Sequence, residues 1–194
     1  MKTALWIISI AVVIVVVLYF VLIGNIDTSD PEIISLDTPI QILGIEIKTS
    51  DKAIYKDVEK VAKRFKAIKE GHPIPNLKEP WASVNISKDY DKQQGTFTYI
   101  VGDVITKVEN VPDQLQQYEI PALTYAVFTI RPKSKMAWGI TMGRMKRFIY
   151  SEWLPKSGYE PSDIIGDFEL HDDRSLGKNP EIQLYVALKA KKNN

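Results

Sequence analysis

The chain has 194 residues with 25 basic and 24 acidic side chains, so its formal net charge is +1 and its length suits one domain with an appendage. Proteins bind nucleic acid largely by neutralising its phosphates with an excess of basic side chains, and a near-neutral chain has no such excess. We therefore expect no nucleic-acid partner. The sequence has no cysteine and two histidines, His72 and His171, which excludes disulfides, thiol catalysis and Cys- or His-rich zinc sites, and we expect no cofactor.

The N-terminus carries a long hydrophobic run. Residues Ala4 to Ile23 are apolar at every position except Ser9. As a helix this run spans about 30 Å, which is the thickness of the hydrocarbon core of a bilayer. No Ala-x-Ala-like cleavage site follows it, and a soluble helix of such length keeps a polar face. The run therefore predicts an uncleaved transmembrane helix at 4–23, ahead of the alternatives of a signal peptide and a buried core helix.

The charges around this run predict its orientation. Lys2 lies before it, whereas Asp27, Asp30 and Glu32 follow it. Under the positive-inside rule the N-terminus stays in the cytoplasm and the rest of the chain is exported. We therefore expect a single-pass protein of the cell membrane, with a cytoplasmic N-terminus at 1–3, a linker at 24–38, a folded domain at 39–190 and a polar tail at 191–194.

The first half of the domain reads as strand, helix, strand, strand. Residues 39–48 place β-branched isoleucines on both sides of Gly44, which is typical of a strand. Residues 53–69 place apolar side chains at spacings of three and four, which predicts an amphipathic helix. Strands are expected at 81–86 and 96–101, on either side of a polar turn.

The second half repeats this order. A strand is expected at 124–130, a helix at 138–153, and strands at 167–171 and 181–188. The helix carries one apolar stripe, made by Trp138, Met142, Met145, Ile149 and Trp153. The repeat is one of pattern and not of sequence identity. We predict an α+β fold of duplicated β-α-β-β units, with one helix on each antiparallel half-sheet and an approximate two-fold axis between them.

Five segments carry a resemblance to a known family: Phe97 to Gly102, Ile120 to Phe128, Ile149 to Glu160, Asp167 to Glu169 and Glu181 to Lys189. In this order and spacing, the chain resembles the GyrI-like small-molecule-binding domain over about residues 39–190. This is the effector-binding domain of AraC- and MerR-type regulators. The resemblance implies two β-α-β-β units and a cleft between them that binds small, often cationic or aromatic, molecules. Some members inhibit DNA gyrase, and some hydrolyse cyclopropane-containing compounds.

Two departures from the family pattern change what the resemblance implies. The regulators join this domain to a helix-turn-helix, whereas here the expected membrane segment precedes it, which argues against a transcription factor and against inhibition of cytoplasmic gyrase. The family's last strand carries a cleft-facing Glu, and our alignment places Gln183 at that position. A neutral amide neither balances a cation nor takes up a proton, so the resemblance implies an uncharged or weakly polar aromatic ligand and disfavours hydrolysis. Glu181 and Glu169 are the acids able to replace that carboxylate in part.

The expected ligand-binding residues are Tyr99, Tyr125, Trp153, Glu169, Glu181, Gln183 and Tyr185. In the last strand, the face of Glu181, Gln183 and Tyr185 is mixed polar and aromatic, as a cleft is, and a solvated sheet face is the alternative. The resemblance places Tyr99 and Tyr125 at positions that line the family's cleft. These two tyrosines and Trp153 are equally compatible with core packing. Burial of Glu169 would raise its pKa. We expect Tyr99, Tyr125 and Gln183 to line one cavity.

His171 begins a charged stretch that continues through Asp172, Asp173 and Arg174. We interpret this stretch as a loop and not as a metal site or a catalytic triad. The leading hypothesis for the chain is a membrane-tethered, non-enzymatic module that binds a small aromatic or weakly polar molecule. The alternatives are a small hydrolase of the same fold that uses Glu181 or Glu169, and a structural or interaction protein of the membrane. No motif identifies the ligand or a protein partner.

Overall fold

The structure is a computed structural model, and it describes residues 6, 9, 10, 12, 14, 25–134 and 137–191. In this part of the chain, nine strands form one sheet in which every pair is antiparallel. The strands are β1 (Glu32–Ser35), β2 (Ile40–Ser50), β3 (Ser83–Asp91), β4 (Thr96–Ile105), β5 (Gln116–Ile120), β6 (Thr124–Ile130), β7 (Tyr159–Pro161), β8 (Asp167–His171) and β9 (Ile182–Ala190). The helices are α2 (Ile54–Gly71), α3 (Trp138–Phe148) and α4 (Leu154–Lys156), with a π-helical turn at Ile149–Trp153 and a 3-10 turn at Asp173–Leu176.

The order of the elements confirms the predicted α+β class. The first unit runs β2-α2-β3-β4 and the second runs β6-α3-β8-β9. Across the sheet the strands lie in the order β1-β6-β9-β8-β3-β4-β2-β5, and β7 pairs with β9. The two units therefore meet edge to edge through β3 and β8, and each contributes its strands in the same order outward from that junction.

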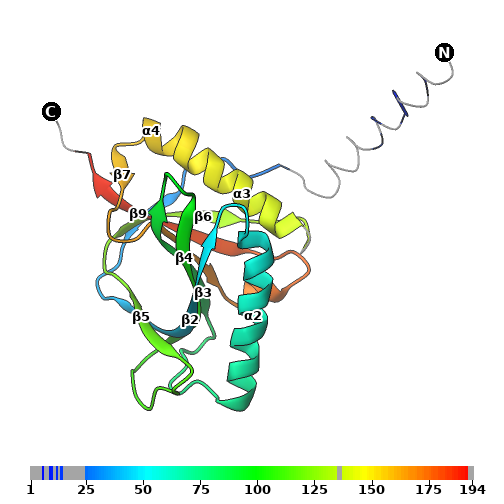
Figure 1. The fold of residues 1–194 in the computed structure, drawn as a ribbon. Helices are drawn as coiled ribbons and strands as arrows, with labels where there is room; N and C mark the ends of the chain where they lie inside the picture. The colour runs from blue at the N-terminus through cyan, green and yellow to red at the C-terminus, as the bar shows by residue number, and fades with distance from the viewer. Residues whose placement is uncertain are drawn as a thin grey trace.

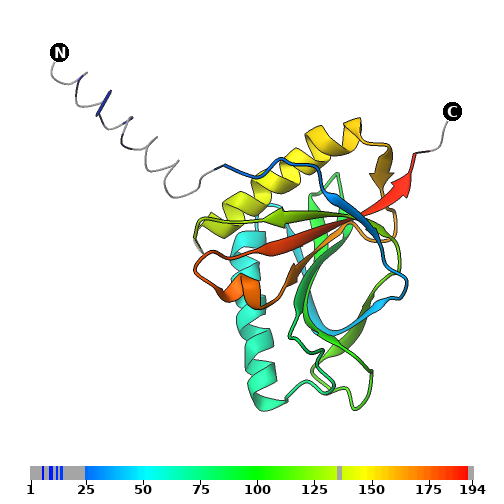
Figure 2. The same ribbon diagram turned by 180° about the vertical axis from the view of Figure 1, so that it is seen from behind.

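Both long helices cover one face of the sheet. Figure 1 shows α2 and α3 in front of the strands, and Figure 2, turned by 180°, shows the strands in front of the helices. α2 packs Val61 and Phe65 against Leu43, Ile45 and Val101 of the first unit. α3 packs apolar side chains against the second unit in the same way, namely Met142 and Met145 against Phe128, Leu184 and Val186. These are the apolar stripes that the spacing of the sequence predicts.

A third apolar cluster lies on the face that the helices leave uncovered. Tyr125 and Phe168 are fully buried there, and the cluster draws side chains from strands of both units. The sheet curls around it, and a close approach of two strands contributes to this curvature. Gly44 and Gly102 are directly paired across β2 and β4, and a Cβ on Gly44 would lie 2.3 Å from the carbonyl oxygen of Val101.

The structure differs from the sequence prediction at the edges of the sheet. The segment 24–38, expected as a linker, contains β1, which pairs with β6. β5 and β7, which were not predicted, pair with β2 and β9. The predicted membrane helix at 4–23 lies outside the described residues, apart from the helical Trp6, Ser9, Ile10, Val12 and Ile14. Among the residues described, no helix has the length and apolar character to cross a membrane.

Candidate functional site

The helix-facing side of the three central strands is polar, whereas the strands that flank them are apolar on this side. Directly paired residues of antiparallel strands project to the same face, so the register defines three rows across β4, β3 and β8. We call this set the central grid, and its rows are Asp103–Ser83–His171, Val101–Asn85–Glu169 and Tyr99–Ser87–Asp167. The grid lies beneath the junction of the two units, between the parts of the sheet that α2 and α3 cover.

Two acids of the grid share a lysine that comes from α3. The Lys146 Nζ donates a hydrogen bond of 2.8 Å to Asp167 Oδ1 and lies 3.9 Å from Glu169 Oε1. The side chains of Asp167 and Glu169 are 8% and 9% exposed, and that of Lys146 is 27% exposed. Burial opposes a charge on Lys146, but the two carboxylates outweigh it and raise the pKa of the ammonium above its ordinary value. The group therefore stays protonated at neutral pH.

Glu169 is held in its charged form by several neighbours. Its Oε2 lies 3.3 Å from His171 Nε2 and accepts a hydrogen bond of 3.4 Å from Asn85 Nδ2. Burial alone would raise the pKa of Glu169, as the sequence analysis expects, but the His171 contact and the Lys146 charge lower it overall. Glu169 is therefore a buried carboxylate and not a buried carboxylic acid.

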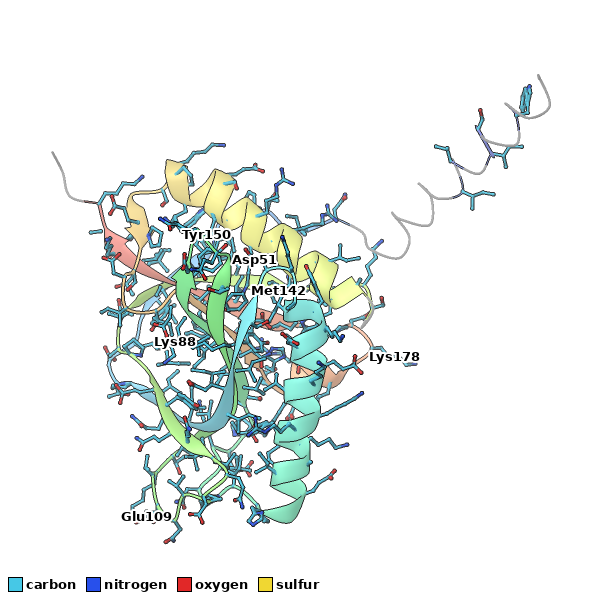
Figure 3. All side chains as sticks on the ribbon, viewed as in Figure 1. Asp51, Lys88, Glu109, Met142, Tyr150 and Lys178 are labelled. Carbon is cyan, nitrogen blue, oxygen red and sulfur yellow. The ribbon has the colours of Figure 1, made fainter. Side chains whose placement is uncertain are left out.

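Aromatic side chains surround these charges. The Trp138 ring stacks on the His171 ring, with 5.0 Å between centroids and 4° between planes. Tyr150 lies in the π-helical turn, and its hydroxyl donates a 3.0 Å hydrogen bond to Asp167 Oδ2. Figure 3 shows Met142 of α3 and Tyr150 of the π-helical turn on the side toward the sheet, whereas Glu109 and Lys178 lie on peripheral loops. π-Helical turns often occur at functional sites, and this one positions a tyrosine against a grid acid.

Burial and the nearby acids also act on the tyrosines. Burial, and then the charges of Glu169 and Asp167, raise the pKa of Tyr99 well above its ordinary value. Tyr150 is 37% exposed, and its partial burial together with the charge and hydrogen bond of Asp167 raises the pKa of its hydroxyl in the same direction. Both hydroxyls therefore remain protonated over the physiological range, and each can act as a hydrogen-bond donor.

The third acid of the grid is paired from the other helix. Lys69 of α2 donates a 2.6 Å hydrogen bond to Asp103 Oδ2, and the Asp103 side chain is 1% exposed. The second oxygen, Oδ1, is buried and has no hydrogen-bond partner among the described residues. Each unit thus contributes one lysine from its helix to an acid of the grid.

The two helices approach each other closely at one end of the grid. A Cβ on Gly139 would lie 2.8 Å from Cε1 of Tyr55, and a Cβ on Gly143 would lie 3.1 Å from the Tyr55 hydroxyl. The two glycines therefore make room on α3 for a tyrosine from the first turn of α2. Gly139, Gly143, Lys146 and Tyr150 are spaced by four, three and four residues, so they share one face of the helical run. That face of the helical run and the Tyr55 side chain therefore lie above the grid.

Of the predicted ligand-binding residues, the structure brings Tyr99 and Glu169 together on the central grid. Tyr125, Gln183 and Tyr185 project to the opposite face, because their paired neighbours Ala187, Leu170 and Phe168 belong to the apolar cluster on that side. The expectation that Tyr99, Tyr125 and Gln183 line one cavity is therefore wrong. The mixed face of β9 does not face the helices; the face of Ile182 and Leu184 does.

The residues on that opposite face have structural contacts of their own. Tyr125 is fully buried, and its hydroxyl donates a 2.7 Å hydrogen bond to the carbonyl oxygen of Pro121. Tyr185 stacks on Phe168 with 4.4 Å between centroids and donates a 3.1 Å hydrogen bond to Gln183 Oε1. Gln183 also lines a cavity of about 250 Å³ beside β1, together with Asp27, Glu32 and Arg131 among others.

The last two predicted residues lie outside the grid. Trp153 meets Phe128 edge to face at 5.2 Å and lines a second cavity, of about 300 Å³, with Phe148 and Lys156 among others. Glu181 is paired with two arginines, at 3.0 Å from Arg131 Nε and 2.8 Å from Arg174 Nη1. Neither of these two cavities is lined by a grid residue. Lys146 and Tyr150 cover the grid at Asp167, and Trp138 covers it at His171.

Five site residues were not predicted from the sequence, namely Asn85, Trp138, Lys146, Tyr150 and Asp167, and the charged stretch from His171 onward was interpreted as a loop although the predicted strand 167–171 ends at that residue. His171 is the last residue of β8. The alternation of polar and apolar residues from Asp167 to His171 is the signal that could have found this polar face. Among the described residues, no group of three or more His, Asp or Glu side chains is placed to hold a metal ion.

Comparison with known proteins gives the family of the chain. The family described as "Cass2: Integron-associated effector binding protein" matches residues 32–188. The transcriptional regulator BrlR of Pseudomonas aeruginosa is 28% identical over 120 residues, which are 60% of this chain and 42% of the regulator. The chain thus matches less than half the length of that relative.

Three solved structures share the fold. The integron cassette protein from the mobile metagenome of Vibrio cholerae has a TM-score of 0.59 at 10% identity, over 85% of this chain and 99% of its own. SAV2435 bound to tetraphenylphosphonium has a TM-score of 0.62 at 11% identity, over 83% and 94%. The C-terminal domain of EcmrR has a TM-score of 0.59 at 10% identity, over 85% and 100%. At these identities the likeness shows the fold alone.

Proposed function

The chain belongs to the Cass2 family of integron-associated effector-binding proteins, and from that premise we propose that it binds a small aromatic ligand between α2 and α3, above the central grid. The observation that carries the proposal is the grid itself. Buried acids, an amide and hydroxyls lie together on the helix-facing side of the central strands, whereas the flanking strands are apolar on that side. Four aromatic side chains lie among or beside them, namely Tyr55, Tyr99, Trp138 and Tyr150. A few polar groups that converge among aromatic side chains are typical of small-molecule sites.

The chemistry of the ligand follows from the side chains around the grid. Tyr55, Trp138 and Tyr150 offer flat apolar surfaces, and tyrosine hydroxyls offer hydrogen bonds. SAV2435 was bound to tetraphenylphosphonium, which carries four phenyl rings, and this supports an aromatic ligand here. The ligand of this chain is uncharged or weakly polar, because Lys146 already supplies a positive charge to the acids of the grid.

We also propose that residues 4–23 anchor the protein in the cell membrane, with the N-terminus in the cytoplasm and the domain exported. The hydrophobic run has the length of a bilayer span, and Lys2 precedes it while acids follow it. The near-neutral charge of the chain favours a role in binding small molecules over a role in binding DNA. The module would then sample ligands outside the cytoplasm.

The test is calorimetric titration of the purified full-length chain in detergent, with protein-free micelles as the blank. The probe is triphenylphosphine oxide, which is aromatic and uncharged. We expect saturable binding that Tyr55→Ala weakens about fivefold or more, since an aromatic contact is worth on the order of 1 kcal/mol. The control is Tyr90→Ala, because Tyr90 is exposed and its hydroxyl bonds Asp51, which is not a grid residue. Absence of saturable binding, or equal losses in the two variants, would refute the proposed site.

A further inference from the structure

We propose that the Lys146 ammonium acts as an internal counter-ion, occupying the position where a cationic ligand would meet Asp167 and Glu169, and that it thereby makes the site select uncharged ligands. This inference rests on the proposed function and names the residue that determines its specificity. It gives the chain a cation of its own beside two buried acids that are otherwise suited to an external cation.

The contacts of Lys146 are those that a bound cation would make. Its Nζ lies 2.8 Å from Asp167 and 3.9 Å from Glu169, so it bridges two carboxylates on one strand. Both carboxylates are more than nine-tenths buried, whereas Lys146 keeps 27% of its side chain exposed. The lysine thus reaches from the outside of the site to its floor. A ligand approaching the two acids meets the lysine first.

The charges of the grid are nearly balanced by the protein itself. Three acids, Asp103, Asp167 and Glu169, face two ammonium groups, Lys69 and Lys146, and His171 adds a further positive charge when protonated. Buried charges are stable only when they are paired, so a balanced grid has no need of a cation from solution. Removal of Lys146 leaves two adjacent acids without an ammonium, and a cation from solution then restores the pairing.

The geometry of α3 favours this arrangement. Lys146 shares a face with Gly139 and Gly143, where the helix carries no side chain, and with Tyr150, which hydrogen-bonds the other oxygen of Asp167. Asp167 is therefore approached by a cation on Oδ1 and by a hydroxyl on Oδ2. If Lys146 were absent, Tyr150 and Tyr55 would remain as aromatic walls beside an unpaired carboxylate. Such a combination suits a lipophilic aromatic cation.

The experiment compares two probes of similar shape and different charge, tetraphenylphosphonium and triphenylphosphine oxide. Each is titrated calorimetrically into the full-length wild-type chain and into Lys146→Met, in detergent with protein-free micelles as the blank. We expect the wild type to prefer the uncharged probe, and Lys146→Met to bind the cation about tenfold more tightly or better than the wild type does. The double variant Lys146→Met/Glu169→Gln should lose most of that gain.

The matched control is Lys156→Met, which removes the same charge from an exposed position in α4 of the same helical run. It should leave both affinities unchanged. If Lys146→Met does not fold, Lys146→Gln serves instead, because its amide can still donate a hydrogen bond to Asp167 without carrying a charge.

The outcomes separate this inference from the proposed function. If the uncharged probe binds the wild type and Lys146→Met gains nothing for the cation, the counter-ion role is refuted and the ligand site stands. If the wild type already binds the cation as tightly as Lys146→Met does, the counter-ion role is refuted as well. If neither probe binds any folded form, the proposed function fails and the inference fails with it.

Discussion

Substitution of Lys146 by Met should destabilise the protein, and the size of the effect follows from the burial of its partners. The change leaves Asp167 and Glu169, 8% and 9% exposed, without their shared ammonium. Loss of one partner of a buried ion pair costs about 3–5 kcal/mol. Lys146 is partly exposed, and water can enter the space it leaves, so we expect about 3 kcal/mol, the lower end of that range.

The loss of unfolding free energy caused by Lys146→Met should depend on pH, and the structure determines the direction of that dependence. In the wild type, the neighbours of Glu169 lower its pKa, so this stabilisation is present above the unfolded carboxyl value of about 4.3 and is lost as the pH falls through the lower folded value. In Lys146→Met, Glu169 stays buried but loses the lysine charge, so it takes up a proton at higher pH. A protonated carboxyl needs no counter-ion. The difference in unfolding free energy between wild type and variant should therefore be largest near pH 7 and shrink toward pH 4.

The assay is urea unfolding of the full-length chain in detergent at several pH values, followed by tryptophan fluorescence. The double variant Lys146→Met/Glu169→Gln should recover about 1 kcal/mol or more of the loss, because the two side chains interact directly. Lys156→Met should be close to wild type, since an exposed lysine contributes little. A Lys146→Met protein as stable as the wild type at pH 7, or one whose deficit grows as the pH falls, would refute the reasoning.

Three further predictions concern other parts of the chain. Gly44→Ala should cost about 3 kcal/mol or more in unfolding free energy or prevent folding, because its Cβ would lie 2.3 Å from a backbone oxygen; Gly71→Ala, with nothing within 4 Å, is the control in the same urea assay. Gln183→Glu should leave the affinity for tetraphenylphosphonium unchanged in calorimetry, because Gln183 lies on the face opposite the grid; a gain comparable to that of Lys146→Met would contradict the placement. A reporter fused after Asn194 should be active only outside the cytoplasm, as the charges around residues 4–23 predict, and cytoplasmic activity would reverse that orientation.

The long elements could be predicted from the sequence because their periodicity is local. The stripes of α2 and α3 and the alternation in β4, β6 and β9 each repeat often enough to define both type and extent. β1, β5 and β7 have three to five residues, and each exists through pairing with a strand that is not its neighbour in sequence: β6, β2 and β9 respectively. Such short segments carry no periodicity of their own, so the sequence could not predict them.

The site was predicted only in part, because the sequence does not show which side of β9 faces the helices. Alternation along β9 correctly separates Gln183 and Tyr185 from Ile182 and Leu184, but it does not say which set faces the helices. We expected the more polar set to face the cleft. In the structure both sides of β9 are covered, and the polar residues that face the helices lie on β3 and β8 instead. Their pairing joins residues eighty or more positions apart, and no local pattern reveals it.

The junction between the units indicates that the charge on the grid is not a requirement of the fold. Antiparallel pairing places β3 and β8 in equivalent positions on either side of the junction, with Asn85 opposite Glu169. Yet β3 contributes Ser83, Asn85 and Ser87, which carry no charge, whereas β8 contributes Asp167, Glu169 and His171. A strand with hydroxyls and an amide on its helix-facing side is thus compatible with packing at the junction, and the acid of the first unit, Asp103, lies one strand further out on β4. The acids of β8 and the lysine that pairs with them are therefore compatible with the ligand site proposed above.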